Sequence, residues 1–470
     1  MSFFRKLRLP LVCLLALALT SAFMLPSTQA QASGYTVTDL GTLGANPSKG
    51  FGINNSSNVV GNSYVNSGDF SPQPFFWSAG TMTNLGNFGG DGGAAFAVND
   101  SNFAVGDADL PSGTTHPFIW SPSTSLQDIG TLGGDFAVAW DINNANKVVG
   151  QSETSPLVDR AFVWTVGTGM QSLGTLPGGS SSTARGINNN DQIVGESGTT
   201  SGETHAFLYS GGTMSDIGTL GGNRSFAYKI NDSAKVVGYS RINNVGINPP
   251  FHAFSYTTGG GMFDLNTLAG GTSSAAYDIN GSGVIVGYSE VAGGVHHAFV
   301  YDTQSGMRDL NTLTAGSNWT LQEAQGINDA GQITGFGLNP DGALHAFLLT
   351  PNTPQTLTIS GQVTENGTGL AGVTVTLGGS ASATTQTNAT GNYSFANLTA
   401  GGNYTVTPSL TNYTFVPPQA TFNNLASNAT ANFVATFNGT PPPVGLQYYP
   451  LAHPVRILDT RAGQTACDTP

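Results

Sequence analysis

The sequence predicts an all-β protein: a seven-bladed β-propeller closed by its N-terminal strand, followed by a small β-sandwich. One pattern recurs seven times between about residues 35 and 350, with a spacing of 43 to 49 residues. Each copy reads as four short strands separated by turn residues, which is typical of one propeller blade. A different pattern of alternating apolar residues follows at 357–437 and favours a sandwich.

Residues 1–32 have the features of a secretory signal peptide. Arg5, Lys6 and Arg8 precede an apolar core at 11–19, and a small-residue cleavage pattern ends at Ala32. The core is shorter than the roughly 20 residues that span a bilayer. We therefore expect a secreted or cell-surface protein whose mature chain has no transmembrane segment.

The composition excludes some classes of partner. The chain has a formal net charge of −13, and removing the three basic residues of the signal leaves −16. Nucleic-acid affinity depends on Lys and Arg neutralising phosphates, so we expect no nucleic-acid partner. Cys467 is the only cysteine after residue 32, so no disulfide can form within the mature sequence.

Three landmarks define the repeat in residues 33–351. A recurring asparagine ends an "IN" or "VN" pair, a glycine follows it by seven residues, and a phenylalanine marks the third strand. The asparagines are Asn54, Asn99, Asn143, Asn188, Asn231, Asn280 and Asn328. The glycines are Gly61, Gly106, Gly150, Gly195, Gly238, Gly287 and Gly335. The phenylalanines are Phe75, Phe118, Phe162, Phe207, Phe254, Phe299 and Phe347.

The four strands of a copy are exemplified by residues 225–231, 235–240, 205–209 and 214–220. A right-handed β-helix is the rival architecture, although its coils are usually shorter. The seventh copy stops after its third strand, whereas residues 35–43 read as a fourth strand without a preceding partner. We expect this N-terminal strand to complete the last blade and to cover its exposed edge.

The combination of "HAF", "DLGTLGG" and "IN…VVG" resembles the HAF family of probable extracellular repeat proteins of bacteria. The resemblance covers roughly residues 35–350, with Gln73 and Arg160 where most other copies have histidine. It implies an exported bacterial repeat protein and does not imply a particular biochemical activity.

Linkers and two further segments follow the repeats. Residues 352–356 form a proline-containing linker, and 357–437 are similar to the carboxypeptidase regulatory-like domain through "GQV", "GVTVTL" and "GNYSFANL". This resemblance implies a transthyretin-like sandwich that serves as a spacer or binding module. Residues 438–445 form a stiffer Pro-rich linker. Residues 446–470 read as the start of a truncated further segment, and "PVRILDTRAG" within it resembles a motif of bacterial cell-surface modules.

Most chemically suggestive residues recur once per copy, which favours structural roles. Equivalent positions are spread around a ring, so they cannot converge on one metal ion or give each serine its own base. Five recurring histidines are expected to bond a loop or a neighbouring blade, and the recurring aspartates to make cross-blade hydrogen bonds. Six aromatic residues that stand two positions after the phenylalanine are expected to form core, with exposed sugar-stacking platforms as the alternative. The sequence therefore predicts no catalytic residue, no metal site and no cofactor.

Loop length is the feature that varies between copies. The distance from the second residue after the repeat glycine to the histidine position of the third strand is eight residues in five copies, ten in copy one and twelve in copy five, so the intervening loop is longest in these two copies. Because binding residues concentrate on loops of rigid scaffolds, Asp69, Phe70, Arg241 and Asn244 are the candidate ligand-binding residues.

The function predicted from the sequence is that of an exported, non-catalytic binding or display scaffold for an extracellular glycan or protein ligand. A lectin-like propeller and a polysaccharide-active hydrolase or lyase remain as alternatives. An enzyme would need a cluster of carboxylates outside the repeat register, and nothing in the sequence brings the candidates together. These candidates are Glu153, Asp159, Glu196, Glu203, Glu290 and Glu323.

Overall fold

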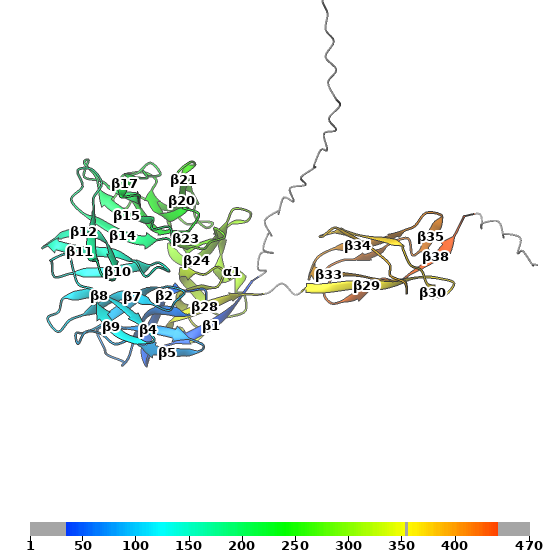
Figure 1. The fold of residues 1–470 in the computed structure, drawn as a ribbon, viewed down its shortest axis with the longest axis horizontal. Helices are drawn as coiled ribbons and strands as arrows, with labels where there is room; N and C mark the ends of the chain where they lie inside the picture. The colour runs from blue at the N-terminus through cyan, green and yellow to red at the C-terminus, as the bar shows by residue number, and fades with distance from the viewer. Residues whose placement is uncertain (1–33, 353–355, 440–470) are drawn as a thin grey trace, which may run out of the picture. The chain divides into compact units, whose positions relative to one another are not determined.

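The computed structural model describes residues 34–352 and 356–439 (Figure 1). The chain divides into two units between Thr353 and Pro354, and each is described by itself. The predicted signal peptide, most of both linkers and the segment at 446–470 lie outside the described residues.

The first unit is a β-propeller in which the described strands form seven antiparallel, four-stranded sheets. The first three sheets contain β2 (Ala45–Ile53), β3 (Val59–Tyr64), β4 (Gln73–Ser78), β5 (Thr81–Asn84); β6 (Gly93–Val98), β7 (Ala104–Asp109), β8 (Thr115–Ser121), β9 (Thr124–Asp128); and β10 (Ala137–Ile142), β11 (Val148–Ser155), β12 (Val158–Thr165), β13 (Gly169–Gly174). The next three contain β14 (Ser182–Ile187), β15 (Ile193–Gly198), β16 (Thr204–Ser210), β17 (Thr213–Asp216); β18 (Ser225–Ile230), β19 (Val236–Arg241), β20 (Phe251–Thr257), β21 (Gly261–Asp264); and β22 (Ser274–Ile279), β23 (Ile285–Val291), β24 (Val295–Asp302), β25 (Gly306–Asp309). A single helical turn, α1 (Leu310–Leu313), follows β25.

The last sheet is assembled from both ends of this unit. It contains β26 (Thr320–Ile327), β27 (Ile333–Leu338) and β28 (Leu344–Pro351), and its fourth strand is the N-terminal β1 (Tyr35–Gly41). β1 runs antiparallel to β28, with Tyr35 opposite Pro351 and Asp39 opposite Phe347. The predicted pairing of the N-terminal strand with the incomplete copy is therefore present.

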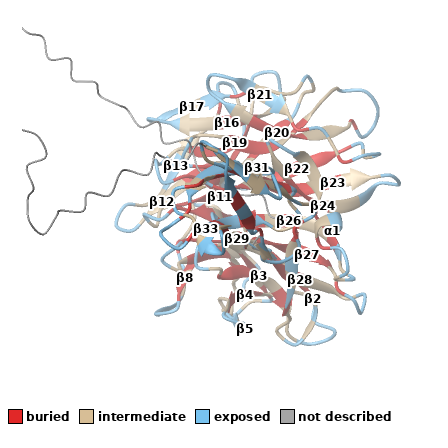
Figure 2. Ribbon diagram, turned by 90° about the vertical axis from the view of Figure 1, so that its right-hand side faces the viewer, coloured by how far each residue is buried: buried red, intermediate tan, exposed pale blue. Residues whose placement is uncertain are grey.

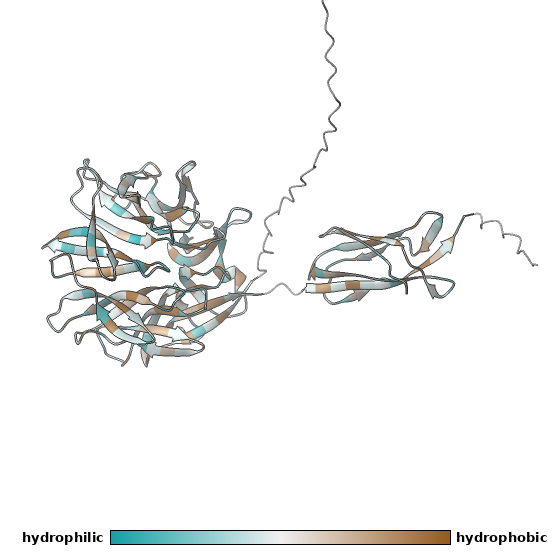
Figure 3. Cartoon of the chain, viewed as in Figure 1, coloured by the Kyte–Doolittle hydropathy of each residue, from teal (hydrophilic) through white to brown (hydrophobic). Residues whose placement is uncertain are grey.

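Apolar side chains hold neighbouring sheets together. Seven clusters each combine residues of two adjacent sheets, and one joins the last sheet to the first through Leu348, Ala346, Phe75 and Trp77. All seven repeat phenylalanines are fully buried. Of the six aromatics two positions further on, Trp77 is buried in the core, and the other five are partly buried and pack against the same clusters as the phenylalanines. Figure 2 shows this burial along the strands, and Figure 3 shows apolar positions on the strands of both units.

The repeat glycine stands at a position of the second strand where a side chain has no room. At Gly150, a Cβ atom would overlap the carbonyl oxygen of Val138 and the ring of Phe162. Both neighbours belong to the same sheet, where the inner strand bulges between Ala139 and Asp141. The glycine is thus required by close contact within one sheet.

The seven recurring asparagines form a cyclic chain of hydrogen bonds. Each side-chain Nδ2 donates to the backbone carbonyl of the next asparagine, and Asn328 returns to the carbonyl of Asn54 at 3.0 Å. In each, the Oδ1 accepts at least one backbone N–H of its own turn, as Asn99 does from Ser101 and Phe103. Each asparagine therefore fixes its own turn and links it to the next sheet. We call these seven residues the asparagine ring.

The second unit is a β-sandwich. One sheet contains β29 (Thr356–Glu365), β30 (Thr368–Gly369), β33 (Asn392–Thr399), β35 (Tyr413–Val416), β37 (Ala429–Thr430) and β38 (Phe433–Phe437); the other contains β31 (Thr374–Gly379), β32 (Ala383–Gln386), β34 (Tyr404–Ser409) and β36 (Ala420–Phe422). Alternate residues such as Val375, Leu377 and Tyr404 fill the core. Among the described residues of both units, no helix is long and apolar enough to cross a membrane.

Candidate functional site: the axial cavity

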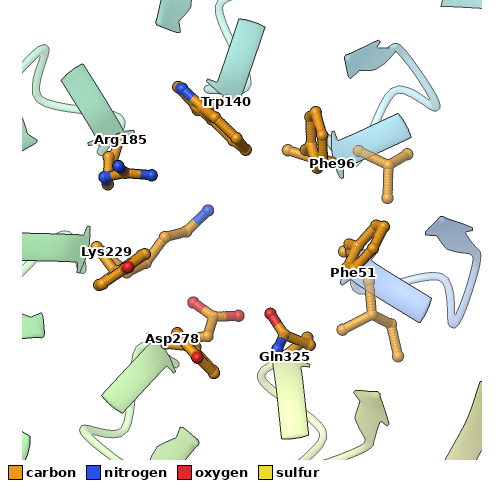
Figure 4. Close-up of a pocket in the computed structure, with 13 residues that line it drawn as sticks. Phe51, Phe96, Trp140, Arg185, Lys229, Asp278 and Gln325 are labelled. Atoms are coloured by element: carbon orange, nitrogen blue, oxygen red, sulfur yellow. The ribbon is translucent and has the colours of Figure 1, made fainter. Parts of the chain in front are cut away.

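The inner strands of the seven sheets surround a cavity of about 230 Å³ (Figure 4). Each strand contributes the side chain that stands three positions before the ring asparagine. These residues are Phe51, Phe96, Trp140, Arg185, Tyr228, Tyr277 and Gln325. Most other landmarks of the repeat are nearly uniform, whereas this position holds five different residue types. We call this space the axial cavity.

One side of the axial cavity is aromatic. The ring centroids of Phe51 and Phe96 lie 5.5 Å apart, and those of Phe96 and Trp140 lie 4.5 Å apart. These three neighbouring rings form a continuous wall, as Figure 4 shows. Such a wall offers apolar contact to any flat, C–H-rich face of a ligand.

Arg185 begins the opposite, charged side. Its Nε and Nη2 atoms make hydrogen bonds of 2.7–3.0 Å to the carboxylate of Glu196. The guanidinium also lies between the rings of Trp140 and Tyr228, at 5.2 and 5.0 Å from their centroids. Burial lowers the pKa of Arg185, but the charge of Glu196 outweighs it and the pKa is raised. Arg185 is thus a fixed cation whose charge is already compensated.

The side chain of Lys229 links its own sheet to one that is not its immediate neighbour. Its Nζ lies 2.7 Å from Oδ1 of Asp141, two sheets away, and Asp141 Oδ2 accepts the N–H of Ile187. Burial lowers the pKa of Lys229, but the charges of Asp141 and then Asp278 outweigh it and raise the pKa. Both cations that line the axial cavity therefore have carboxylate partners.

Asp278 supplies the carboxyl group of the cavity lining. Burial raises its pKa to about 6, although Lys229 acts to lower it. Its two oxygens accept the N–H groups of Ile279 and Ile327, so it also joins two sheets. Next to it, Gln325 donates to Glu323, whose other oxygen lies 3.4 Å from Nδ1 of His296.

A polar mouth adjoins the axial cavity, where the inner strands turn into the second strands. The mouth is bordered by the asparagine ring and by the residues that follow it: Asn55, Asp100, Asn144, Asn189, Asp232, Gly281 and Asp329. Ile53, Val98, Lys229 and Asp278 line both spaces, so the two are contiguous. Four aspartates line this mouth, Asp278 among them, and its lining contains a single cation, the paired Lys229.

The four residues predicted from loop length lie elsewhere. Phe70 is fully exposed, and Asp69 accepts the N–H of Asn66 within its own loop. Arg241 and Asn244 both bond Asn223, in the segment that links two sheets. The structure does not bring the two loops into one site, and none of the four residues lines the axial cavity. Their loops leave the far end of the second strand, away from the polar mouth.

The shared partner of the repeat histidines differs from the one predicted. Each is paired within its own sheet to the aspartate of the "DIG", "DLG" or "DLN" motif, at 2.7–2.9 Å. The pairs are His116–Asp128, His205–Asp216, His252–Asp264, His297–Asp309 and His345–Asp39. His345 also makes the predicted kind of contact with a neighbouring sheet, where its Nε2 lies 2.6 Å from Oδ1 of Asn46. The aspartate's other main contact is the backbone N–H two residues later, as from Gly218 to Asp216, so the predicted cross-blade bond is wrong.

The recurring serines after the glycine have structural roles. Ser152 and Ser240, for example, are fully buried and accept the backbone N–H of Leu132 and Leu220, at the step between sheets. Of the six acidic residues outside the repeat register, Glu196 and Glu323 lie near the axial cavity, where burial first and then their charges raise the pKa of Tyr228. Of the other four, Glu203 bonds Ser201, Glu290 bonds Thr272 and Glu153 accepts the N–H of Leu157, whereas Oδ1 of Asp159 is buried without a hydrogen-bond partner. The described residues contain no group of three or more His, Cys, Asp or Glu that could hold a metal ion.

Sequence reasoning missed the axial residues because it compared loop lengths and the residues that repeat. The available signal was the position three residues before each ring asparagine, where the identity of the residue changes from copy to copy. A position that faces the cavity and varies, while the residues around it repeat, is a candidate for ligand contact.

Comparisons with known proteins identify the second unit and leave the first without an assigned role. Residues 358–436 match the carboxypeptidase regulatory-like domain, and residues 219–341 match a family described as "Protein of unknown function (DUF3466)". Chitinase ChiA of Flavobacterium johnsoniae is 44% identical over 82 residues, which are 17% of this chain and 5% of that protein. The comparisons therefore support a carboxypeptidase regulatory-like domain in the second unit, and the resemblance of the first unit to HAF repeats stays a prediction.

Two solved structures are similar to parts of the chain. TolB from Acinetobacter baumannii has 12% sequence identity and a TM-score of 0.37, with 52% of this chain and 63% of TolB covered. The β-propeller domain of the Trilobed protease from Pyrococcus furiosus has 9% identity and a TM-score of 0.44, with 68% of this chain and 95% of that domain covered.

Proposed function

We propose that this protein is an exported, non-catalytic binding scaffold, built on a seven-bladed propeller that β1 closes, with its ligand site in the axial cavity. The observation that carries the proposal is the break in the repeat at the axis. A frame of asparagine, glycine and phenylalanine recurs in every copy, while the side chains that line the axial cavity differ. Concave, largely apolar spaces with a few polar groups are the usual form of a ligand site.

The chemistry of the axial cavity supports binding rather than catalysis. The carboxylate that lines it, Asp278, accepts two backbone N–H groups, and the carboxylates behind its cations are also bonded internally, Glu196 to Arg185 and Asp141 to Lys229. A catalytic acid or base must instead reach the reacting atom. Export and an extracellular or cell-surface location are supported by the composition of residues 1–32. The similarity to a segment of a protein named a chitinase adds chitin to the polymers worth testing as ligands.

Immobilised peptidoglycan, chitin, cellulose and mucin, incubated with the exported chain, test the proposal. We expect at least one polymer to retain the wild type and to lose the Gln325→Trp variant, in which a large ring fills the axial cavity. Tryptophan already occupies the equivalent position of the third sheet, at Trp140, so the variant should fold. Thr213→Trp, on the exposed outer strand β17, is the matched control and should bind normally.

The same assay separates the axial cavity from the loops. Retention that survives Gln325→Trp but is lost in Phe70→Ala or Asn244→Ala would assign the ligand to the long loops and overturn the axial site. Release of soluble sugar from a polymer, abolished by Glu196→Gln or Glu323→Gln, would establish the enzymatic alternative. Retention of none of the four polymers would count against a scaffold for extracellular polymers.

A further inference from the structure

We propose that the axial cavity receives the end of a neutral oligosaccharide that enters through the polar mouth. This inference rests on the proposed binding function and adds the chemical class of the ligand. It draws on three features: the opposed aromatic and polar sides of the axial cavity, the compensated charges, and the acidic mouth.

The axial cavity has an aromatic side and a mixed side that face each other. Phe51, Phe96 and Trp140 form the aromatic wall, and Figure 4 shows Lys229, Asp278 and Gln325 on the opposite side. The phenol rings of Tyr228 and Tyr277, from the strands that carry Lys229 and Asp278, also line the cavity. A pyranose ring has the same division, with a face of C–H groups and a periphery of hydroxyl groups. Stacking of that face on the aromatic wall turns the hydroxyls toward amide, ammonium and carboxylate groups, which can donate or accept.

Polar capacity remains on that side after the internal bonds are counted. An ammonium group has three N–H donors, and Lys229 directs one of them to Asp141. Arg185 makes its bonds to Glu196 through Nε and Nη2, which leaves its Nη1 donors for a ligand. Hydroxyl groups, which can both donate and accept, suit such a mixed lining better than a purely apolar ligand would.

Charge disfavours an acidic ligand. Both cations of the axial cavity are compensated by carboxylates, at 2.7 Å in each pair. An anion would also have to pass Asp100, Asp232 and Asp329 at the polar mouth, where like charges repel it. A neutral saccharide meets neither barrier.

The size of the space sets the mode of entry. A cavity of about 230 Å³ is smaller than the pockets of about 300–1,000 Å³ that enclose drug-sized ligands, so it suits the terminal part of a chain rather than a folded partner. The polar mouth continues the axial cavity along the axis, so the remaining rings of a chain lie among amide and carboxylate groups. The geometry therefore points to recognition of a chain end.

Calorimetric titration of the exported chain with individual trisaccharides, and with one basic tripeptide, tests this inference. The neutral probes are cellotriose, chitotriose, maltotriose and xylotriose; trigalacturonate and trilysine are the charged probes. We expect a neutral probe to bind, and Trp140→Ala to weaken it tenfold or more. Trp140→Phe should restore most of the affinity because it keeps a ring in the wall. Phe263→Ala, which removes an exposed aromatic ring of the outer strand β21, should leave affinity within twofold.

The outcomes distinguish this inference from the proposed function. Binding of trigalacturonate or trilysine that Gln325→Trp abolishes would overturn the neutral ligand and leave the axial site standing. Binding of a neutral probe that survives both Gln325→Trp and Trp140→Ala would overturn the axial site itself. Retention of a polymer by the axial cavity without binding of any trisaccharide would overturn recognition of a sugar chain end. If Trp140→Ala fails to fold, the Gln325→Trp result decides.

Discussion

The substitution Asn99→Asp tests whether the asparagine ring joins the sheets, because it replaces a single side-chain atom, Nδ2, with an oxygen. Oδ1 of the new carboxylate still accepts the N–H groups of Ser101 and Phe103, so the turn keeps its local bonds. The other oxygen replaces Nδ2, which now donates to the carbonyl of Asn143 at 3.1 Å and to Oδ1 of Asn146 at 2.7 Å. Two attractive contacts to the next sheet become contacts between oxygens.

The expected loss of stability follows from those two contacts. Each neutral hydrogen bond contributes about 1 kcal/mol net, and a buried acceptor left without a donor costs about 1–3 kcal/mol. Asn99 is 4% exposed, so water cannot relieve the contact. We expect the free energy of unfolding to fall by about 3–5 kcal/mol and Tm by roughly 5–12 °C. Protonation of the carboxyl at acid pH restores a donor, so the deficit should shrink as pH falls.

Thermal unfolding followed by circular dichroism at pH 4 and pH 8 measures both effects. Asn243→Asp is the matched control, because Asn243 uses only its side-chain oxygen, which accepts the N–H of Val245. This control should change Tm by about 1 °C or less. Equal Tm values for Asn99→Asp and wild type at pH 8 would refute the claim that the asparagine ring joins the sheets.

Three further predictions concern the frame and the axis. Deletion of residues 35–43 removes the strand that pairs with β28, and we expect Tm to fall by more than about 10 °C in calorimetry; a near-silent deletion contradicts closure by β1. Gly150→Ala forces a Cβ into the carbonyl of Val138 and should cost about 2 kcal/mol or more in denaturant unfolding, whereas Gly259→Ala, with no atom within 4 Å of its Cβ, should be close to neutral. Folding raises the pKa of Asp278 from 3.8 to about 6, so the folded state binds the proton more tightly and this carboxyl's contribution to the unfolding free energy falls by up to about 3 kcal/mol between pH 4 and pH 7. Asp278→Asn should remove that part of the pH dependence, and an unchanged slope would show that the carboxyl is not buried as described.

The strand order of the propeller follows from the sequence because the landmarks recur in register. The phenylalanines and the alternating residues around them specify which face of each strand is buried, and the incomplete seventh copy indicates its partner at the N-terminus. The sandwich follows in the same way from its period-two alternation. These are local signals repeated often enough to outweigh any one irregular copy.

The pairing of specific side chains could not be predicted from spacing alone. His205 and Asp216 are eleven residues apart and meet because Phe207, two residues after the histidine, lies opposite Asp216 across the strand pair. Such a diagonal contact depends on the strand register. The bond from Lys229 to Asp141 spans 88 residues and two sheets, so it requires the full ring geometry. The lining of the axial cavity depends on the strand register and on the arrangement of the sheets around the axis. The lengths of the loops give no information about either.

The asparagine ring also has a direction: every side-chain amide donates forward along the sequence to the next copy, and the last donates to the first. Each copy of the repeat thus presents one donor at one side and one carbonyl at the other, whichever copy it is. Because the donor and the carbonyl are equivalent in every copy, a duplicated or exchanged copy can form the same hydrogen bonds with its neighbours. The residue three positions before the asparagine takes no part in that junction, so each blade can vary its contribution to the axial cavity separately. In each inner strand, one residue joins neighbouring sheets and a different residue, three positions earlier, lines the axial cavity.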